Sequence, residues 1–370
     1  MDNIWELYNN SLLVCNNLQN ISNKENKKSI ACFDLDGTLI VTKSKKRFAV
    51  NEKDWKFFND LNISKKLCEL INKNYILVIM SNQNGIGKGK VSCEQIKTKI
   101  NDIMNNINLP FLILLAIEDD IMRKPRIGMW EFANNFIKNH LNVNIDNKNS
   151  FYCGDAAGRK KDFAASDYKF ALNIGINFKT PESLFLNEID NFNEFIIDFD
   201  PRTIQIKKIL FNLSDDQEIL LLVGSPASGK SSFAKLYCSS YEIICQDELK
   251  TISKCKKKCV EMIKLKKNIV IDCTNRNIKS RSIWTTLANE YSIPIRCVVM
   301  DMNKNLCLHL NRYRKLYKEK QIPDIAIHVF FKNFTIPSIE EGFNEIINLQ
   351  FCIDSIHKNT EEIKKIMSFI

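Results

Sequence analysis

Two aspartates stand one residue apart at the end of an apolar run, in the stretch "ACFDLDGTLI" at residues 31–40. Because side chains alternate along a strand, Asp34 and Asp36 are predicted to point to the same side where the strand ends. Two carboxylates this close repel each other unless a cation or a shared proton intervenes. A capped turn would explain one aspartate and Gly37 but not both acids, so the pattern indicates a site with chemistry of its own.

A second polar interruption follows an apolar run at residues 220–233, "LLLVGSPASGKSSF". It fits G-x-x-x-x-G-K-S between a predicted strand and a predicted helix, which is the context this phosphate-binding loop requires. The glycines let the backbone amides face phosphates at the helix N-terminus. The pattern predicts a site for ATP and Mg²⁺ formed by Gly224, Ser225, Ala227, Ser228, Gly229, Lys230, Ser231 and Ser232, with Lys230 on the β and γ phosphates and Ser231 on the metal.

Size and composition favour a two-domain chain of 370 residues whose hydrophobic content of 45% suffices for two cores. The longest apolar stretches, such as "PFLILLAI", fall short of the roughly 20 residues that span a bilayer, so no membrane association is expected. No secretory pattern opens the chain, and an odd total of 13 cysteines indicates reduced thiols. The net charge of +10 is compatible with a polyanionic partner.

The strands and helices that must carry these residues are predicted to form two α/β domains. The runs "SIACFDL", "YILVIMS", "FLILLAI", "SFYCGD" and "KFALNIG" are predicted strands, and helix-like segments separate them. After "DFDPRT" the pattern restarts with "EILLLVG", "NIVIDCTN" and "IRCVVMD". We therefore expect parallel sheets in both domains. The expected boundaries are an N-terminal extension with a short helical pattern at 1–28, a first domain at 29–200, a linker at 201–213 and a second domain at 214–370.

The sequence "FDLDGTL" resembles the first motif of haloacid dehalogenase (HAD) phosphatases. The resemblance implies a HAD-like Rossmannoid parallel-sheet domain in which Asp34 is the nucleophile that becomes a phospho-aspartate and Asp36 is the general acid and base. It also implies that both aspartates contact Mg²⁺, which with other cationic groups must neutralise the approaching charges.

The other HAD motifs follow in order along the first domain. Ser81 in "VIMSNQNG" matches the residue that hydrogen-bonds the phosphoryl group, and Lys124 in "MRKPRIG" matches the lysine that steadies nucleophile and phosphate. Asp155 in "FYCGDAAGRKKDF" matches a further Mg²⁺ ligand, with Asp162 or Asp167 as a weaker candidate nearby. Each signal is modest alone, so the weight lies in their order.

The second domain resembles the kinase part of the polynucleotide kinase family, a P-loop NTPase-type parallel-sheet domain. By that resemblance Asp247 in "IICQDELK" takes the proton from a 5′-hydroxyl, although it could simply cap a helix. Asp272 in "NIVIDCTN" is suited to the Mg²⁺ shell, and Asn275 matches the family as well. Arg312 in "HLNRYRKLY" matches a lid arginine on the transferring phosphoryl and the nucleotide, with Arg314 as an alternate.

Two positions depart from the family's kinase pattern. Many members carry Gly-Ser-Trp shortly after the base, where this chain has Glu-Leu-Lys-Thr-Ile at 248–252, which puts base contacts in doubt. A further lid arginine is replaced by Leu308, so lid chemistry would rest on Arg312.

The strings "SNQNGIGKGK", "RKPRIGMW" and "GDAAGRKKDF" resemble the phosphatase half of eukaryotic polynucleotide kinase 3′-phosphatases, and "FFKNFTIPSIEEGF" their kinase C-terminus. The resemblance implies an enzyme that hydrolyses 3′-phosphates and phosphorylates 5′-hydroxyls at DNA ends, upstream of a ligase. The basic stretch 43–47 is a candidate DNA guide, although a solvated turn or a localisation signal would explain it too. The phosphopeptide-binding N-terminal domain of the family's animal members is not expected here, because residues 1–28 are too few to form it.

Alternatives remain open at this point. They are an RNA end-healing kinase/phosphatase, a DNA-end-binding scaffold without catalysis, and a small-molecule phosphatase fused to a metabolite kinase. We expect a monomer, and nuclear residence with a possible organellar fraction, from the family's task rather than from a motif.

Overall fold

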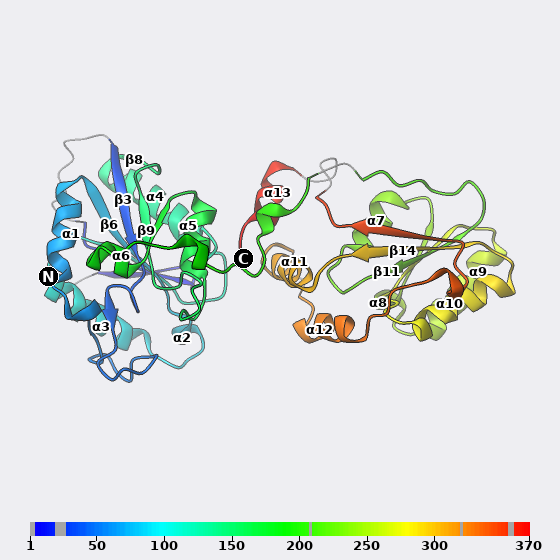
Figure 1. The fold of residues 1–370 in the computed structure, drawn as a ribbon, viewed down its shortest axis with the longest axis horizontal. Coiled ribbons are helices and arrows are strands. Elements are labelled where there is room, and N and C mark those ends of the chain that lie inside the picture. The colour runs from blue at the N-terminus through cyan, green and yellow to red at the C-terminus, as the bar shows by residue number, and fades with distance from the viewer. Residues whose placement is uncertain (1–3, 19–26, 207–208, 319–320, 354–358) are drawn as a thin grey trace. The chain divides into compact units, whose positions relative to one another are not determined.

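The protein consists of two compact units, residues 1–198 with 369–370, and residues 199–368. Each is an α/β unit around its own mostly parallel sheet, which confirms the predicted fold class (Figure 1). No helix among the described residues has the length and apolar character needed to cross a bilayer. The computed structural model describes residues 4–18, 27–206, 209–318, 321–353 and 359–370.

The first unit contains a sheet with the strand order β1-β2-β7-β6-β3-β9-β10, and β8 (Asn144–Ile145) pairs with β3 off this path. Its five strands from β7 to β10 run parallel to one another. Strand β2 pairs antiparallel with β7, and β1 pairs antiparallel with β2. Parallel strands buried on both faces explain why these segments are continuous apolar runs. The bounds are β1 Trp5–Tyr8, β2 Leu12–Asn16, β3 Lys27–Phe33, β6 Tyr75–Asn82, β7 Leu112–Ala116, β9 Phe151–Cys153 and β10 Asn177–Lys179.

Helices cover both faces of this sheet and bury a separate apolar cluster on each. The helices α1 (Ile63–Asn72) and α3 (Cys93–Ile107) contribute to one cluster, and α4 (Gly128–Leu141) and α5 (Ser166–Ile174) to the other. The segment after Asp36 leaves the sheet and forms a two-stranded ribbon of β4 (Ile40–Val41) and β5 (Lys56–Phe57). The remaining short helices are α2 (Asn84–Gly87) and α6 (Pro181–Leu186), with 3₁₀ turns η1 (Phe58–Asp60) and η2 (Phe192–Glu194).

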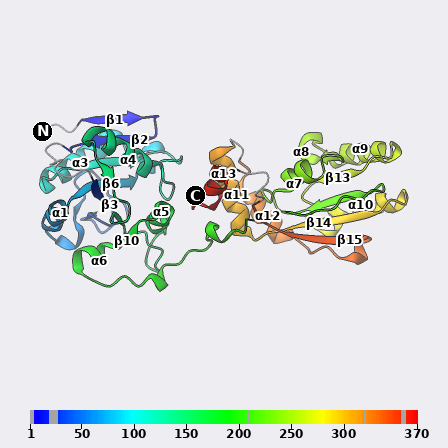
Figure 2. The same cartoon turned by 90° about the horizontal axis from the view of Figure 1, so that it is seen from above.

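The second unit has the all-parallel strand order β12-β13-β11-β14-β15. Figure 2 shows its strands β14 and β15 side by side. Here α9 and α10 help to bury one face of the sheet, and α7 the other. The strands are β11 Ile219–Val223, β12 Glu242–Cys245, β13 Ile269–Asp272, β14 Ile295–Asp301 and β15 Glu345–Gln350. The helices are α7 Lys230–Tyr237, α8 Gln246–Leu249, α9 Ile252–Lys264, α10 Ile278–Glu290, α11 Lys304–Tyr317, α12 Asp324–Asn333 and α13 Thr360–Met367, with 3₁₀ turns η3 (Pro201–Thr203) and η4 (Ile339–Glu341).

Two expectations about elements are wrong. The segment 5–16 is not helical: its strands β1 and β2 form a hairpin that pairs with β7, so it belongs to the first sheet rather than to an extension. Asn9 and Asn10 at its turn have φ of 46° and 54°, values typical of a tight hairpin turn. The run "KFALNIG" lies in helix α5 up to Ile174, and the strand that follows it is β10.

Candidate active sites

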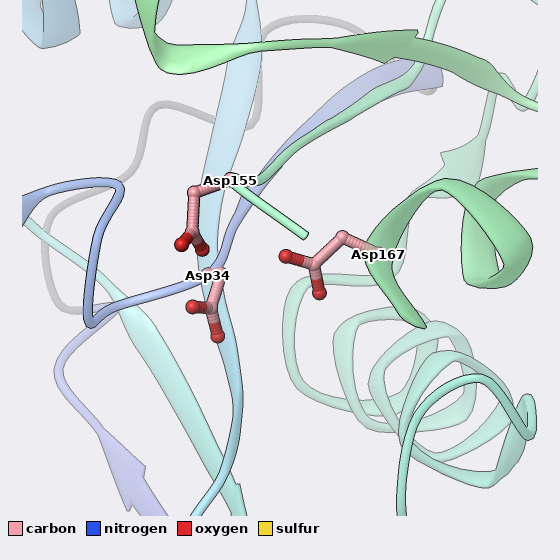
Figure 3. A group of neighbouring side chains, drawn as sticks. All are labelled: Asp34, Asp155 and Asp167. Atoms are coloured by element: carbon pink, nitrogen blue, oxygen red, sulfur yellow. The ribbon is translucent and has the colours of Figure 1, made fainter. Parts of the chain in front are cut away.

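Three aspartates meet at the carboxyl edge of the first sheet (Figure 3). Asp34 follows β3, Asp155 follows β9, and these two strands are adjacent with Phe33 opposite Cys153. Asp167 comes from the first turn of α5, a contact that sequence analysis treated only as a weaker alternative. One carboxylate oxygen from each residue lies within 4.8 Å of the others.

Two glycines make room for this acidic group. A Cβ at Gly37 would lie 2.4 Å from Oδ2 of Asp155, and Gly37 also has a φ of +85°, which side chains rarely adopt. A Cβ at Gly154 would lie 2.3 Å from Oδ2 of Asp167. The backbone therefore approaches two of the carboxylates so closely that no side chain fits.

Lys124 supplies the buried cation of this site, as the sequence predicts. Its Nζ donates to Oδ1 of Asp34 at 2.7 Å and to Oδ1 of Asp167 at 2.8 Å. It also donates to the hydroxyl of Tyr152, which sequence analysis missed. The Asn82 side-chain amide accepts a hydrogen bond from the Lys124 backbone N–H at 2.9 Å and donates one to the Lys124 carbonyl oxygen at 3.0 Å. Because Asn82 is the last residue of β6, these bonds fix the Lys124 backbone relative to the end of that strand.

The charge balance of this group favours a bound cation. Burial raises the pKa of Asp34 to about 6 against the opposing effect of Lys124, and burial together with Asp34 and Asp167 raises the pKa of Asp155 to about 8. Although burial alone would lower the pKa of Lys124, Asp167 and Asp34 raise it above its usual value. A single ammonium faces three carboxylates, and clustered carboxylate oxygens are what Mg²⁺ prefers, so the residues fit this ion.

The Asp36 carboxylate does not join the acidic group. Its Oδ1 accepts a hydrogen bond from Nζ of Lys99 at 2.7 Å, and its Oδ2 accepts one from Nε2 of Gln83 at 2.9 Å. The same Gln83 amide donates to Oγ of the buried Ser81 at 3.1 Å. The side chain expected to contact the metal is therefore held by Lys99 and Gln83, two residues that sequence analysis did not single out.

Asp162, the other alternative for the metal, lies outside the acidic group. It accepts hydrogen bonds from the backbone N–H groups of Ala157 and Arg159 at 3.2 and 3.0 Å, and it pairs with the Arg159 side chain. Its role is to shape the loop that presents Phe163, a residue that is 80% exposed. The Arg47 guanidinium lies 3.4 Å from the centre of the Phe163 ring.

The phosphate-binding loop connects β11 to α7 as predicted. Gly229 precedes the helix with a φ of +88°, and Ala227 also has a positive φ of 62°. Oγ of Ser228 is buried without a hydrogen-bond partner among the residues that the structure describes. A Cβ at Gly224 would lie 2.7 Å from this oxygen. The loop is thus a tight turn with a spare buried donor, which suits a phosphate.

Lys230 and Ser231 are held by the loop and by the neighbouring strand. The buried Nζ of Lys230 donates to the carbonyl oxygens of Gly224 and Ser225 at 3.0 and 2.8 Å. Burial lowers the pKa of Lys230, while Asp272 acts in the opposite direction. Oγ of Ser231 donates to Oδ2 of Asp272 at 2.6 Å. The hydroxyl and the carboxylate expected at the metal are therefore in contact, which fits Mg²⁺.

The remaining kinase residues lie at the same edge of the second sheet or on α11. Asp247 is exposed in the first turn of α8, directly after β12, whose last residue, Cys245, is in register with Asp272. Asn275 is buried and donates from Nδ2 to the carbonyl of Leu222 at 2.8 Å. Arg312 is exposed on α11 and forms no ion pair with another described residue, so its role stays a prediction.

A cavity of about 250 Å³ opens next to the phosphate-binding loop. It lies on the side of β13, and β12 with Asp247 follows in the same direction. Its volume leaves room for a flat ring, and its mainly apolar lining suits one. The lining residues are Pro226, Thr274, Arg276, Ile325, Ala326, Val329 and Phe330.

Mg²⁺ is expected to stabilise the first unit more at pH 8 than at pH 6. Because burial raises the pKa of Asp155 to about 8, the fold without a cation loses stability as the pH rises from about 4 towards 8. At pH 6 the ion must instead displace a proton. We expect a Mg²⁺ concentration near 100 times the Kd at pH 8 to raise Tm by about 5 °C at pH 8. The same concentration is expected to raise Tm clearly less at pH 6, where the Kd is higher.

Calorimetry with and without Mg²⁺ checks this expectation, and Asp155→Asn is the control because the second unit keeps its own metal residues. A Tm increase that is equal at both pH values, or that persists in the variant, would contradict it.

Comparisons with known proteins find relatives for both units of the chain. A family model described as polynucleotide kinase 3 phosphatase matches residues 29–185, and an AAA domain model matches residues 249–337. A polynucleotide 3′-phosphatase of Saccharomyces cerevisiae is 31% identical over 218 residues, covering 45% of this chain and 91% of the relative. A bifunctional polynucleotide phosphatase/kinase of Schizosaccharomyces pombe is 41% identical over 339 residues, covering 89% of this chain and 81% of the relative. With this likeness along most of its length, and with a candidate site in each of its two units, the chain belongs to the family of bifunctional polynucleotide phosphatase/kinases.

Proposed function

We propose that this chain prepares broken DNA strands for ligation. The first unit removes a 3′-phosphate and the second phosphorylates a 5′-hydroxyl from ATP, with Mg²⁺ at both sites. The observation that carries this proposal is the presence of two separate phosphoryl sites in one chain of this family: the aspartate group with Lys124, and the phosphate-binding loop with the Ser231–Asp272 pair.

In the first unit Asp34 attacks the phosphorus atom of the 3′-phosphate. Lys124 holds its Oδ1, so Oδ2 is the attacking oxygen. The bond from phosphorus to the sugar oxygen breaks, and the leaving oxygen takes a proton from Asp36. Water then attacks the phosphorus of phospho-Asp34 and gives a proton to Asp36, which releases inorganic phosphate and restores Asp34. Mg²⁺ held by Asp34, Asp155 and Asp167 would neutralise charge on the phosphoryl oxygens.

In the second unit Asp247 takes the proton of the 5′-hydroxyl, whose oxygen attacks the γ-phosphorus of ATP, and ADP leaves. Lys230 exchanges its contacts with the loop carbonyls for contacts with phosphate oxygens. Ser231 and Asp272 would hold the metal, and Arg312 on α11 is the residue we propose for the transferring phosphoryl. Catalysis here is mainly positioning and charge neutralisation.

A polynucleotide rather than a small phosphate ester is the substrate we propose for the first unit. The exposed Arg47–Phe163 stack and the lysines before Arg47 offer positive charge and a flat ring, the two features that bind single strands. Asp54 fixes this loop by accepting hydrogen bonds from the backbone N–H groups of Ser44 and Val50 at 2.8 and 2.9 Å.

The cavity beside the phosphate-binding loop is the site we propose for the terminal base of the 5′-hydroxyl strand, because it lies towards Asp247 rather than towards β14. Replacing the exposed Ile325 and Val329 by Ser is expected to raise KM for the 5′-hydroxyl end about tenfold and leave KM for ATP unchanged, since apolar contacts are lost. Initial rates over both substrates measure this. The exposed Ile336, changed to Ser, is the control, and an effect on KM for ATP alone would contradict the assignment.

Side-by-side turnover of matched DNA and RNA ends tests the proposed substrate. We expect kcat/KM to favour DNA for both activities. A strong preference for RNA would support RNA end healing instead, and tight end binding without turnover in the presence of Mg²⁺ and ATP would support a non-catalytic scaffold. The proposal is completed by a monomer that acts in the nucleus, with an organelle as a second compartment, and by a ligase that acts next in the reaction order.

A further inference from the structure

A buried lysine on α3 reaches the carboxylate that the phosphatase reaction uses as acid and base. Lys99 is 5% exposed and lies on the apolar face of the helix between Ile96 and Ile103. Its Nζ is 2.7 Å from Oδ1 of Asp36, whose side chain is 48% exposed. A lysine on such a face is usually replaced by an apolar residue unless its charge has a partner.

The contact is the first in a row of four side chains. Lys99 holds one oxygen of Asp36, Gln83 holds the other at 2.9 Å, and the same Gln83 amide reaches Oγ of Ser81 at 3.1 Å. Ser81 is the predicted phosphoryl contact at the end of β6. The row therefore links α3 to the place where the phosphoryl group is bound, and it sets the position of Asp36 along that line.

The same row keeps Asp36 out of the acidic group of Asp34, Asp155 and Asp167. Without Lys99 the carboxylate would lose its only described cationic partner and could turn towards a metal ion bound by that group. A carboxylate that binds the metal is no longer free to exchange a proton with the leaving oxygen or with water.

We propose that Lys99 is a positioning residue for the 3′-phosphatase reaction, which holds the Asp36 carboxylate beside the phosphoryl site and away from the metal group. The inference rests on the proposed phosphatase mechanism. It assigns Lys99 no contact with the substrate: the lysine acts through Asp36, and an effect of its removal must therefore depend on the presence of Asp36.

Lys99→Met, which keeps length and apolar packing, is expected to lower phosphatase kcat about 10- to 100-fold, with KM for the 3′-phosphate end changed less than about threefold. The 5′-kinase rate stays unchanged because it belongs to the other unit. Lys97→Met on the same helix, which removes a pair with Glu94, is the matched control and should leave both activities unchanged.

The decisive measurement is single-turnover hydrolysis with excess enzyme, so that slow variants remain measurable. In an Asp36→Asn background, Lys99→Met should cause no further loss, because effects that act through one residue are not additive. An equal loss with and without Asp36, or an unchanged kcat, would overturn the proposal.

Two further comparisons keep the test decisive. If Lys99→Met unfolds the first unit, Lys99→Arg and Lys99→Gln replace it: the charged variant should retain clearly more activity than the neutral one, and equal activity would overturn the proposal. Wild-type hydrolysis is measured in the same series, because its absence would refute the proposed function itself rather than the role of Lys99.

Discussion

Asp34→Asn is expected to lower 3′-phosphatase turnover by about 10⁴-fold or more, because an amide oxygen cannot replace the carboxylate nucleophile. The substitution keeps the shape of the side chain and an acceptor for Nζ of Lys124, so the group around it remains packed. The 5′-kinase activity is expected to stay within about twofold of the wild type, because its residues lie in the other unit.

Release of inorganic phosphate from a 3′-phosphorylated oligonucleotide measures this loss, and transfer of labelled phosphate to a 5′-hydroxyl oligonucleotide measures the kinase in the same preparation. Asp60→Asn is the matched control, since Asp60 is an exposed aspartate paired with Lys56. Phosphatase activity near the wild-type level in Asp34→Asn would remove Asp34 from the nucleophile's role.

Lys230→Met is expected to lower 5′-kinase turnover by about 10³-fold or more and to leave the phosphatase unchanged. Met has the length to fill the buried space of Lys230 but carries no charge to neutralise the ATP phosphates. The substitution also removes the ammonium group that donates to the carbonyl oxygens of Gly224 and Ser225. No ammonium is then available to move from these carbonyls to the phosphates of ATP.

Steady-state kinase rates over a range of ATP concentrations measure this effect. The control is Lys235→Met, because Lys235 is an exposed lysine on the same helix α7. A kinase that is still active in Lys230→Met, or a phosphatase that is lost with it, would contradict the assignment of the loop.

The catalytic candidates at strand ends could be predicted from the sequence because local patterns determine them. Asp34, Asp155 and the loop from Gly224 to Ser231 each follow a short apolar run, and the carboxyl ends of adjacent parallel strands meet at one edge of a sheet. The spacing of residues in "FDLDGTL" and "GSPASGKS" was therefore sufficient to predict the two candidate sites without knowledge of the fold.

Contacts between distant segments could not be predicted in this way. Tyr152 reaches Lys124 from β9, and nothing in its local sequence marks this contact. Asp167 reaches Lys124 from α5, and the sequence indicated it only as a weaker metal candidate beside Asp162. Lys99 left a weak signal, since it occupies an apolar position of its helix, but its partner Asp36 is 63 residues away. The sequence predicts a helix at 5–16, where the structure has a hairpin, because the apolar residues of this segment also fit a helical period. The two asparagines at its turn, Asn9 and Asn10, are the local signal that favours a hairpin.

The central claim is that two independent phosphoryl sites in one chain make both ends of a break ready for ligation. A nicked duplex with a 3′-phosphate and a 5′-hydroxyl, incubated with Mg²⁺, ATP and a ligase, tests it most directly. The account predicts that wild type gives sealed product, that Asp34→Asn and Lys230→Met each give none, and that a mixture of the two variants restores sealing. Failure of the mixture, with each variant still performing its remaining reaction, would contradict the account, as would the loss of both reactions in either folded variant.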